Sequence, residues 1–208
     1  MTTATQIALS EEQKAAIEAG KPLIIPASWE EFMDFLPTTP YKVEFVNNEI
    51  IVMGLAKFLH EWLVSHVIWI LKNFYQGKPN VFVLGSNLGV SRPEKSFFNP
   101  DVTVVKGMPD FYRNSKSIVK NPHLVVEVLS ESTSNYDWES KMPRYQRMDT
   151  MQEIVMIDPF EKAITVISRT TEVKVWTMTI YDQLTDTVII DGNTLPLSSF
   201  FEGMPIID

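Results

Sequence analysis

Cysteine is absent from the 208-residue sequence. This absence excludes disulfide bonds, zinc sites built from thiolates and catalysis by a cysteine nucleophile, and it agrees with a reducing compartment. Histidine is also scarce, with three residues. Any metal ion bound by this chain must therefore be held by oxygen atoms or by one of a few imidazoles.

Long hydrophobic runs are missing as well. No apolar stretch reaches the roughly 18 to 20 residues that a membrane-spanning helix needs. The segment from Met1 to Leu9 has neither the basic start nor the apolar centre of a secretory signal. We therefore expect a soluble, cytoplasmic protein.

Positive charge is in deficit, because 18 Lys and Arg residues face 26 Asp and Glu residues, for a formal net charge of −8. This balance opposes nonspecific binding to nucleic acid, which depends on neutralising phosphates. It argues against a nuclease without excluding one, since net charge says little about a local groove. A site of clustered carboxylates is itself acidic until a metal ion binds.

The length and the 45% hydrophobic content suit one domain with a sizeable core. A capped helix is predicted from Ser10 to Gly20, inside an N-terminal extension of residues 1–25. A second short helix is expected between Ser28 and Pro37. We predict a single domain over residues 26–208.

The hydrophobic pattern within that domain predicts a mixture of strands and helices. Alternation on both sides of Asn47-Asn48 predicts a hairpin within Tyr41–Met53, and apolar residues at helical spacing predict a long helix between Leu55 and Phe74. A loop is expected over 110–121, and a polar helix over 136–148 that Pro143 makes irregular. Further strands are predicted over residues 81–90, 100–105, 124–129, 153–157, 163–168, 173–180 and 187–190. This order predicts an α/β or α+β sheet flanked by helices.

Two carboxylates stand in or beside β-branched runs that are typical of buried strands. Asp101 precedes Val102-Thr103-Val104-Val105, and Glu127 interrupts Leu124–Leu129. A lone carboxylate there is usually an edge residue or half of a structural ion pair. Burial of an ionised carboxylate costs several kcal/mol unless a cation or hydrogen bonds compensate. Two of them on neighbouring strands therefore favour a shared divalent cation such as magnesium.

A stripe of three polar residues, Asp137, Lys141 and Tyr145, has the four-residue spacing that places side chains on one side of a helix. Alone, the Asp–Lys pair is an ordinary surface salt bridge worth about 0.3 to 0.5 kcal/mol. If the turn at 130–135 folds this helix back over the strand carrying Glu127, Lys141 reaches the carboxylates instead.

Two further residues have two interpretations each. His60, at the start of the long predicted helix, is either a partly buried structural histidine or a site residue. Glu44, in the first hairpin strand, is more often a solvent-facing partner of Lys42 or Lys57 than a site residue.

Several of these segments, taken together and in order, resemble a known family. They are residues 41–53 (YKVEFVNNEIIVM), His60, residues 100–105 (PDVTVV), residues 124–133 (LVVEVLSEST), the stripe Asp137, Lys141 and Tyr145, and residues 153–159 (EIVMIDP). From roughly Pro26 to Phe201 the chain resembles the Uma-type restriction endonucleases, which are abundant in cyanobacteria.

The resemblance implies a PD-(D/E)XK nuclease core, with a mixed sheet flanked by helices, and magnesium-dependent hydrolysis of DNA phosphodiesters. It makes Asp101 the first acidic element and Glu127 the second. The usual lysine two residues later is replaced by Leu129, and the family pattern assigns its role to Lys141. Glu44 and His60 match further motif positions. The chain departs from the family at Asn48, where glycine is common, and at Pro143.

These observations lead to the hypothesis of a metal-dependent DNA endonuclease. Asp101, Glu127 and the main-chain carbonyl of Val128 would hold magnesium, with manganese as an alternative. Lys141 would position a water or stabilise the transition state, and His60 and Tyr145 would contact a phosphate.

Two other functions stay open at this point. One is a catalytically inactive nuclease fold that acts as a binding or assembly module, and the other is hydrolysis of a smaller phosphate ester. A homodimer is also expected, because double-strand cleavage needs two sites. Trp176, Met178 and Ile180 could supply its apolar patch, although they are equally good core residues.

Overall fold

The computed structural model describes residues 7–92, 95–130 and 133–206. The first six residues of the predicted extension and part of the polar connection at Pro93-Glu94 lie outside these ranges. The chain divides into two compact units, one formed by Met1–Ala56 with Ser91–Asn99 and the other by Lys57–Val90 with Pro100–Asp208. The prediction of one domain from residue 26 onward stays a prediction.

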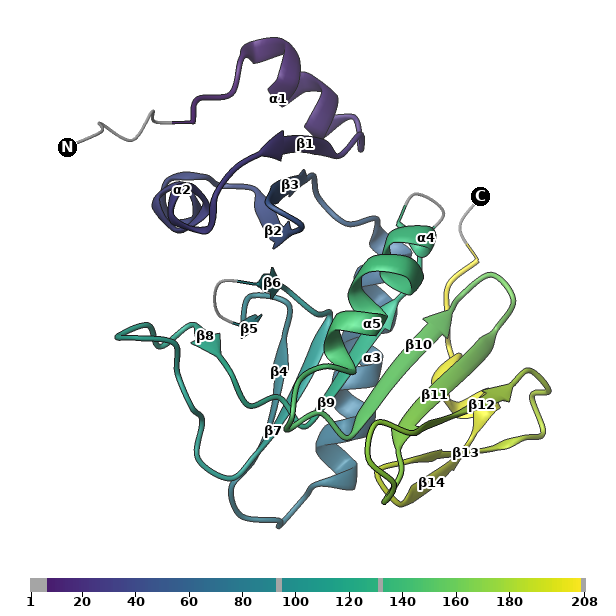
Figure 1. The fold of residues 1–208 in the computed structure, drawn as a ribbon. Helices are drawn as coiled ribbons and strands as arrows, with labels where there is room; N and C mark the ends of the chain where they lie inside the picture. The colour runs from purple at the N-terminus through teal and green to yellow at the C-terminus, as the bar shows by residue number, and fades with distance from the viewer. Residues whose placement is uncertain (1–6, 93–94, 131–132, 207–208) are drawn as a thin grey trace. The chain divides into compact units, whose positions relative to one another are not determined.

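The first unit is an antiparallel sheet with helices (Figure 1). Its strands β1 (Leu23–Pro26), β3 (Glu49–Met53), β2 (Lys42–Val46) and β6 (Ser96–Phe98) pair in that order. Helices α1 (Glu11–Glu18) and α2 (Trp29–Phe35) each begin at a serine capping box, as the sequence predicts, and the 3-10 turn η1 (Leu36–Thr38) follows α2. The core of this unit is aromatic, with ring centroids 5.1 to 5.5 Å apart among Trp29, Phe32, Phe45 and Phe97.

The predicted hairpin is confirmed. Asn47 and Asn48 have φ values of 54° and 59°, and the two strands pair on either side of them with Val46 opposite Glu49. Two consecutive left-handed residues form the tight turn whose twist matches that of the strands. Asn tolerates this conformation better than other non-glycine residues, which explains why Asn48 can replace a glycine.

The second unit is a six-stranded mixed sheet in the order β12-β11-β10-β9-β7-β4. The strands are β4 (Val81–Gly85), β7 (Val102–Lys106), β9 (Leu124–Val128), β10 (Glu153–Asp158), β11 (Ala163–Arg169) and β12 (Trp176–Tyr181). Only β9 and β10 are parallel to each other; the other neighbours in this sheet are antiparallel. Two short hairpin strands, β13 (Thr187–Ile190) and β14 (Asn193–Pro196), and a 3-10 turn η3 (Leu197–Phe200) complete the unit.

Helices cover both faces of this sheet (Figure 1). The long helix α3 (Phe58–Phe74) packs on one face, where Leu124, Val126 and Val128 of β9 join the main hydrophobic core. Because side chains alternate along a strand, Glu127 points to the opposite face. There it meets the helical segment of residues 134–145. The predicted α+β class with a mixed sheet flanked by helices is confirmed.

The helix predicted over residues 136–148 is irregular, as expected from Pro143. It consists of α4 (Ser134–Tyr136), a π-helical turn η2 (Asp137–Lys141) and α5 (Met142–Tyr145). Pro143 has no N–H to donate to a preceding carbonyl, so the regular hydrogen-bond ladder cannot continue through it. The irregularity that the sequence predicts is therefore a widened turn that contains Lys141.

Other differences concern short strands. The predicted strand at 81–90 is two strands, β4 and β5 (Gly89–Arg92), and the predicted loop at 110–121 contains β8 (Ile118–Val119), which pairs with β5. The strands β1, β6 and β14 lie outside the predicted strands. None of the helices in the described ranges is long and apolar enough to cross a membrane.

A polar cluster joins the β13–β14 turn to the rest of the second unit. Asp191 accepts a hydrogen bond from the Tyr75 hydroxyl (2.7 Å), contacts His123 Nε2 (3.0 Å) and pairs with Lys106. Its backbone N–H donates to Glu153 (2.7 Å). Burial acts to raise the pKa of Asp191, but the hydrogen bonds from His123, Lys106 and Tyr75 outweigh it and hold that pKa well below its ordinary value of 3.8.

We predict that Asp191→Asn lowers the free energy of unfolding by about 2 kcal/mol at pH 7, because charge-assisted hydrogen bonds are lost. Since the pKa of Asp191 is lower in the folded state, its ionised form contributes fully above about pH 4 and less as the pH falls toward the folded pKa. Urea unfolding measured from pH 7 to pH 2 should therefore show that the difference in free energy of unfolding between wild type and variant becomes smaller below about pH 4. The exposed Asp149→Asn is the control, and a gap independent of pH would contradict the prediction.

Candidate active site

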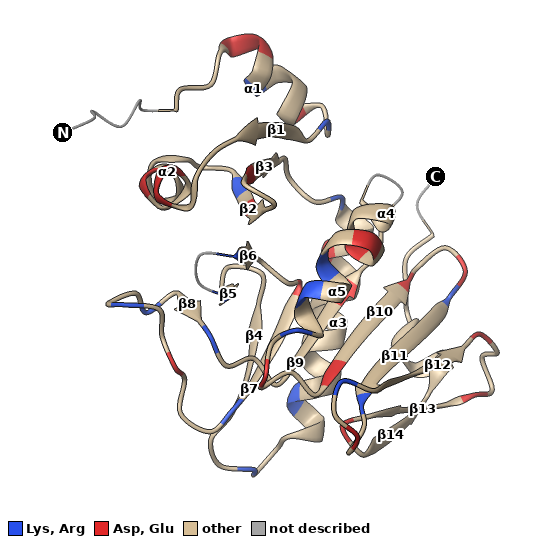
Figure 2. Cartoon of the chain, in the orientation of Figure 1, with Lys and Arg blue, Asp and Glu red and all other residues tan. Residues whose placement is uncertain are grey.

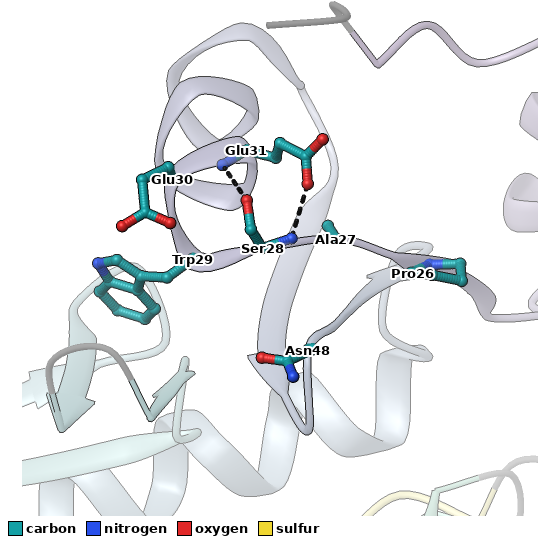
Figure 3. Close-up of a pocket in the computed structure, with 7 residues that line it drawn as sticks. All are labelled: Pro26, Ala27, Ser28, Trp29, Glu30, Glu31 and Asn48. Carbon is teal, nitrogen blue, oxygen red and sulfur yellow. Dashed lines mark hydrogen bonds between the residues drawn. The ribbon is translucent and has the colours of Figure 1, made fainter. Parts of the chain in front are cut away.

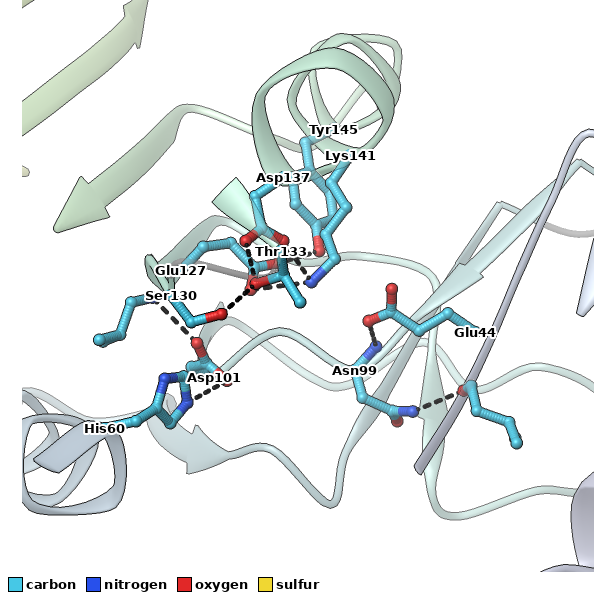
Figure 4. A network of polar contacts seen from close by, with 12 residues as sticks. Glu44, His60, Asn99, Asp101, Glu127, Ser130, Thr133, Asp137, Lys141 and Tyr145 are labelled. Atoms are coloured by element: carbon cyan, nitrogen blue, oxygen red, sulfur yellow. Dashed lines mark hydrogen bonds and ion pairs between the residues drawn. The ribbon is translucent and has the colours of Figure 1, made fainter. Parts of the chain in front are cut away.

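Asp101 lies directly before β7, between Pro100 and Val102, and is only 3% exposed. Its Oδ2 accepts a hydrogen bond from the Val128 N–H at 2.9 Å, and its Oδ1 lies 3.2 Å from His60 Nε2 (Figure 4). The carboxylate thus connects β7 with β9 and with the first turn of α3. His60 is partly buried, as its structural interpretation predicts, and it contacts Asp101; its role as a site residue stays a prediction.

Glu127 lies inside β9 and is 2% exposed. The Tyr145 hydroxyl donates to its Oε1 at 2.6 Å, and the Lys141 ammonium donates to its Oε2 at 3.1 Å (Figure 4). The helical segment therefore folds back over β9. This is the arrangement in which Lys141 reaches the carboxylates, one of the two that the sequence allowed for the stripe of Asp137, Lys141 and Tyr145. The other interpretation, a surface salt bridge, is wrong, since Asp137, Lys141 and Tyr145 are all buried.

Asp137 is the second partner of Lys141, with 2.9 Å between its Oδ1 and the ammonium. Its other oxygen accepts a hydrogen bond from Thr133 Oγ1 (3.0 Å), and that hydroxyl lies 2.8 Å from the Ser130 hydroxyl. These contacts hold the ammonium between two carboxylates. The sequence indicated Asp137 by its spacing from Lys141, but Thr133 and Ser130 looked like ordinary turn residues.

Three carboxylates of this cluster are buried, those of Asp101, Glu127 and Asp137. Lys141 pairs with Glu127 and Asp137, and His60 contacts Asp101. Burial of ionised carboxylates is costly unless cations or hydrogen bonds compensate. The cluster contains carboxylate and carbonyl oxygens, the kind of ligand that magnesium prefers. Across the described parts of the chain, no group of three or more His, Asp or Glu residues has a ready-made metal-binding arrangement.

Glu44 belongs to the first unit. It is fully buried, and its Oε1 accepts a hydrogen bond from the Asn99 N–H at 3.1 Å. The Asn99 side chain donates to the Val43 carbonyl at 2.9 Å, which fixes the segment two residues before Asp101 in the chain (Figure 4). The prediction that Glu44 faces the solvent is therefore wrong. Nothing in the sequence indicated Asn99 as its partner.

The residues brought together in the second unit are thus His60, Asp101, Glu127, Val128, Lys141 and Tyr145. A shallow hollow of about 610 Å³ lies elsewhere, in the first unit, lined by Pro26, Ala27, Ser28, Trp29, Glu30, Glu31 and Asn48 (Figure 3). Ser28 and Glu31 there form the cap of α2. The hollow contains none of the predicted site residues, so the buried polar cluster and not this hollow is the candidate site.

Comparison with known proteins shows the family and the fold of the chain. Residues 29–198 match the model of the Uma2 family, which is described as "Putative restriction endonuclease". The chain is 34% identical over 120 residues to the uncharacterized protein sll1609 of Synechocystis sp. (strain ATCC 27184 / PCC 6803 / Kazusa), a match that covers 57% of this chain and 67% of that protein.

A solved structure shares the fold. It is the crystal structure of "a putative nuclease belonging to DUF820" from Anabaena variabilis ATCC 29413, with a TM-score of 0.71 and 18% identity, covering 85% of this chain and 98% of the other. The predicted restriction-endonuclease-like fold and the predicted family are confirmed. The chain belongs to the Uma2 family of restriction-endonuclease-like proteins.

Proposed function

We propose that this protein is a metal-dependent endonuclease that hydrolyses DNA phosphodiester bonds. The observation that carries the proposal is the 3.1 Å contact between the Lys141 ammonium and Glu127, with Asp101 bonded to the next residue of the same strand. Two acids and an ammonium from separate elements are thus gathered in one buried cluster. Membership of a restriction-endonuclease-like family supports a nucleic acid substrate.

Asp101, Glu127 and the main-chain carbonyl of Val128 would hold magnesium or manganese, and water or phosphate oxygens would complete the ligand set. The chemistry that such an ion supplies is to lower the pKa of a water nucleophile and to neutralise phosphate charge. The burial of the Asp101 and Glu127 carboxylates side by side supports a bound cation of this kind, because burying an ionised carboxylate is costly without positive charge nearby.

The other residues have roles that follow from their contacts. Lys141 supplies a fixed positive charge that would position the attacking water or stabilise the charge that develops on the phosphate. Tyr145 holds one oxygen of Glu127 and so fixes the direction of that carboxylate. His60 orients Asp101 and, when protonated, would also attract a phosphate. Tyr145 stays a candidate for contact with a phosphate, and Glu44 stays a candidate site residue.

Cleavage of supercoiled and single-stranded DNA tests this function. With magnesium, we expect Asp101→Ala and Lys141→Ala to lower the cleavage rate by at least about 100-fold, because a metal ligand or a preorganised charge is lost. The exposed Asp149→Ala and Lys72→Ala are matched controls and should cleave at the wild-type rate. Each variant must keep the wild-type circular dichroism spectrum. Equal activity of wild type, Asp101→Ala and Lys141→Ala rejects the proposal.

A separate prediction concerns the stability of the cluster. Tyr145→Phe removes a 2.6 Å hydrogen bond to a buried carboxylate and should lower the free energy of unfolding by about 1.5 to 3 kcal/mol. Tyr41→Phe removes a similar bond from Tyr to Glu18 that is exposed to solvent, and should cost less than about 0.5 kcal/mol. Urea unfolding of both variants measures the difference. Equal losses would contradict the view that Glu127 depends on Tyr145.

A second candidate function is a non-catalytic binding or assembly module with the same fold. It is favoured by the net charge of −8 and by the pairing of Lys141 with two carboxylates, which leaves its charge neutralised within the protein. Such a module has no need of a metal ion at Asp101 and Glu127.

Calorimetric titration with magnesium or manganese separates the two functions. We expect binding to the wild type and to Asp149→Asn, and loss of binding in Asp101→Asn and Glu127→Gln, because each of the last two variants removes an anionic ligand while keeping the side-chain size. Absence of any binding to the folded wild type would favour the module over the nuclease.

A further inference from the structure

The strand β12 forms one edge of the six-stranded sheet, and within the described ranges β11 is its only neighbour in that sheet. Its residues Trp176–Tyr181 include no charged residue, no proline and no glycine (Figure 2). Met178 and Ile180 are 52% and 62% exposed. Natural proteins usually protect an edge of this kind with lysine, proline or a bulge, since its unpaired backbone groups can bind another strand.

The opposite edge of the sheet is different. In β4 only Phe82 is exposed, and at 38% it is barely so. In β12 four of the six residues are exposed, and Val175 just before it is 42% exposed. The exposed apolar surface of this sheet is thus concentrated at β12.

The direction of the free backbone groups follows from the pairing with β11. The Thr170 N–H donates to the Val175 carbonyl at 3.0 Å, so the pair formed by these two residues is a hydrogen-bonded one. Hydrogen-bonded and non-hydrogen-bonded pairs alternate along an antiparallel ladder. The backbone N–H and C=O groups of Trp176, Met178 and Ile180 therefore point away from β11, toward the free edge.

We propose that this edge binds the same edge of a second copy of the chain, so that two β12 strands pair antiparallel about a two-fold axis at Met178. A strand that pairs with itself has the same patch on both sides, as an isologous dimer requires. In this register Met178 of one copy lies opposite Met178 of the other. Trp176 of each copy lies opposite Ile180 of the other. All the outward backbone groups of these three residues then find partners.

The charges beside the strand fit the same register. Lys174 precedes β12 and Asp182 follows it, and both are exposed. Lys174 lies in the turn before β12, with a φ of 63°, so pairing about Met178 brings its side chain beside Asp182 of the other copy at each end of the contact but does not make it part of the ladder. A register shifted by two residues would instead place Asp182 opposite Trp176. Charge complementarity therefore selects the register, and it also offsets the repulsion between two chains of net charge −8.

The contact leaves the candidate active site free. Glu127 is aligned with Met156, Thr165 and Ile180 across four successive strands. At a spacing of about 4.8 Å per strand, Ile180 lies roughly 14 Å from Glu127. The proposal thus does not depend on whether the site is catalytic.

Sedimentation velocity and light scattering on the full chain at micromolar concentration test the proposal. We expect the wild type to have twice the chain mass of 23.8 kDa. Met178→Lys places two ammonium groups opposite each other on the axis and should halve the measured mass. Met108→Lys, at a 77% exposed position in the loop after β7, makes the same change outside β12 and should stay dimeric. A wild type that is monomeric, or a Met178→Lys variant that is dimeric, overturns the proposal.

A charge exchange tests the register itself. Lys174→Asp and Asp182→Lys should each raise the dissociation constant, because each places like charges opposite one another at both ends of the contact. The double variant should restore the wild-type constant, since the pairs form again with their signs reversed. Single variants without effect, or a double variant weaker than both singles, would overturn the register about Met178. The circular dichroism spectrum of each variant confirms that it is folded.

Discussion

The candidate site depends on one buried ion pair, between the Lys141 ammonium and the Glu127 carboxylate. It joins the centre of a core strand to the helical segment that follows it, and neither charge is stable at this depth without the other. Asp137 and Tyr145 extend the pair into a network in which each charged group has a partner. The cost of burying these charges explains why the segment must fold back over the strand.

The sheet supplies the precision of this arrangement. β9 is a central strand that is buried on both faces, with its even-numbered residues in the core under α3. Glu127 has the opposite parity, so a shift of one residue in register would exchange it for a valine and bury the charge in the apolar core. Asp101 strengthens this register by bonding to the Val128 N–H. The site is therefore built on a buried, interior strand of the second unit.

Helix irregularity contributes as well. Pro143 prevents a regular α-helix, and the π-helical turn before it contains both Asp137 and Lys141. Although the helix is widened at this point, the Lys141 ammonium still lies 2.9 Å from Oδ1 of Asp137. The departure from the family pattern at this proline has thus not prevented Lys141 from reaching Glu127. π-helical turns occur frequently at functional sites, which agrees with this location.

The sequence alone determined most of the local structure and the main candidate site residues. Alternation and capping predicted the hairpin, the long helix and the core strands, because these signals act over a few residues. The buried carboxylates were visible as charges within apolar runs. Only the tertiary structure decided that Lys141 is a buried partner of Glu127 and not a surface residue, that Glu44 is bonded to Asn99, and that β12 is an edge. These facts depend on contacts between distant parts of the chain, and the packing of the whole fold sets such contacts, whatever the pattern of the local sequence.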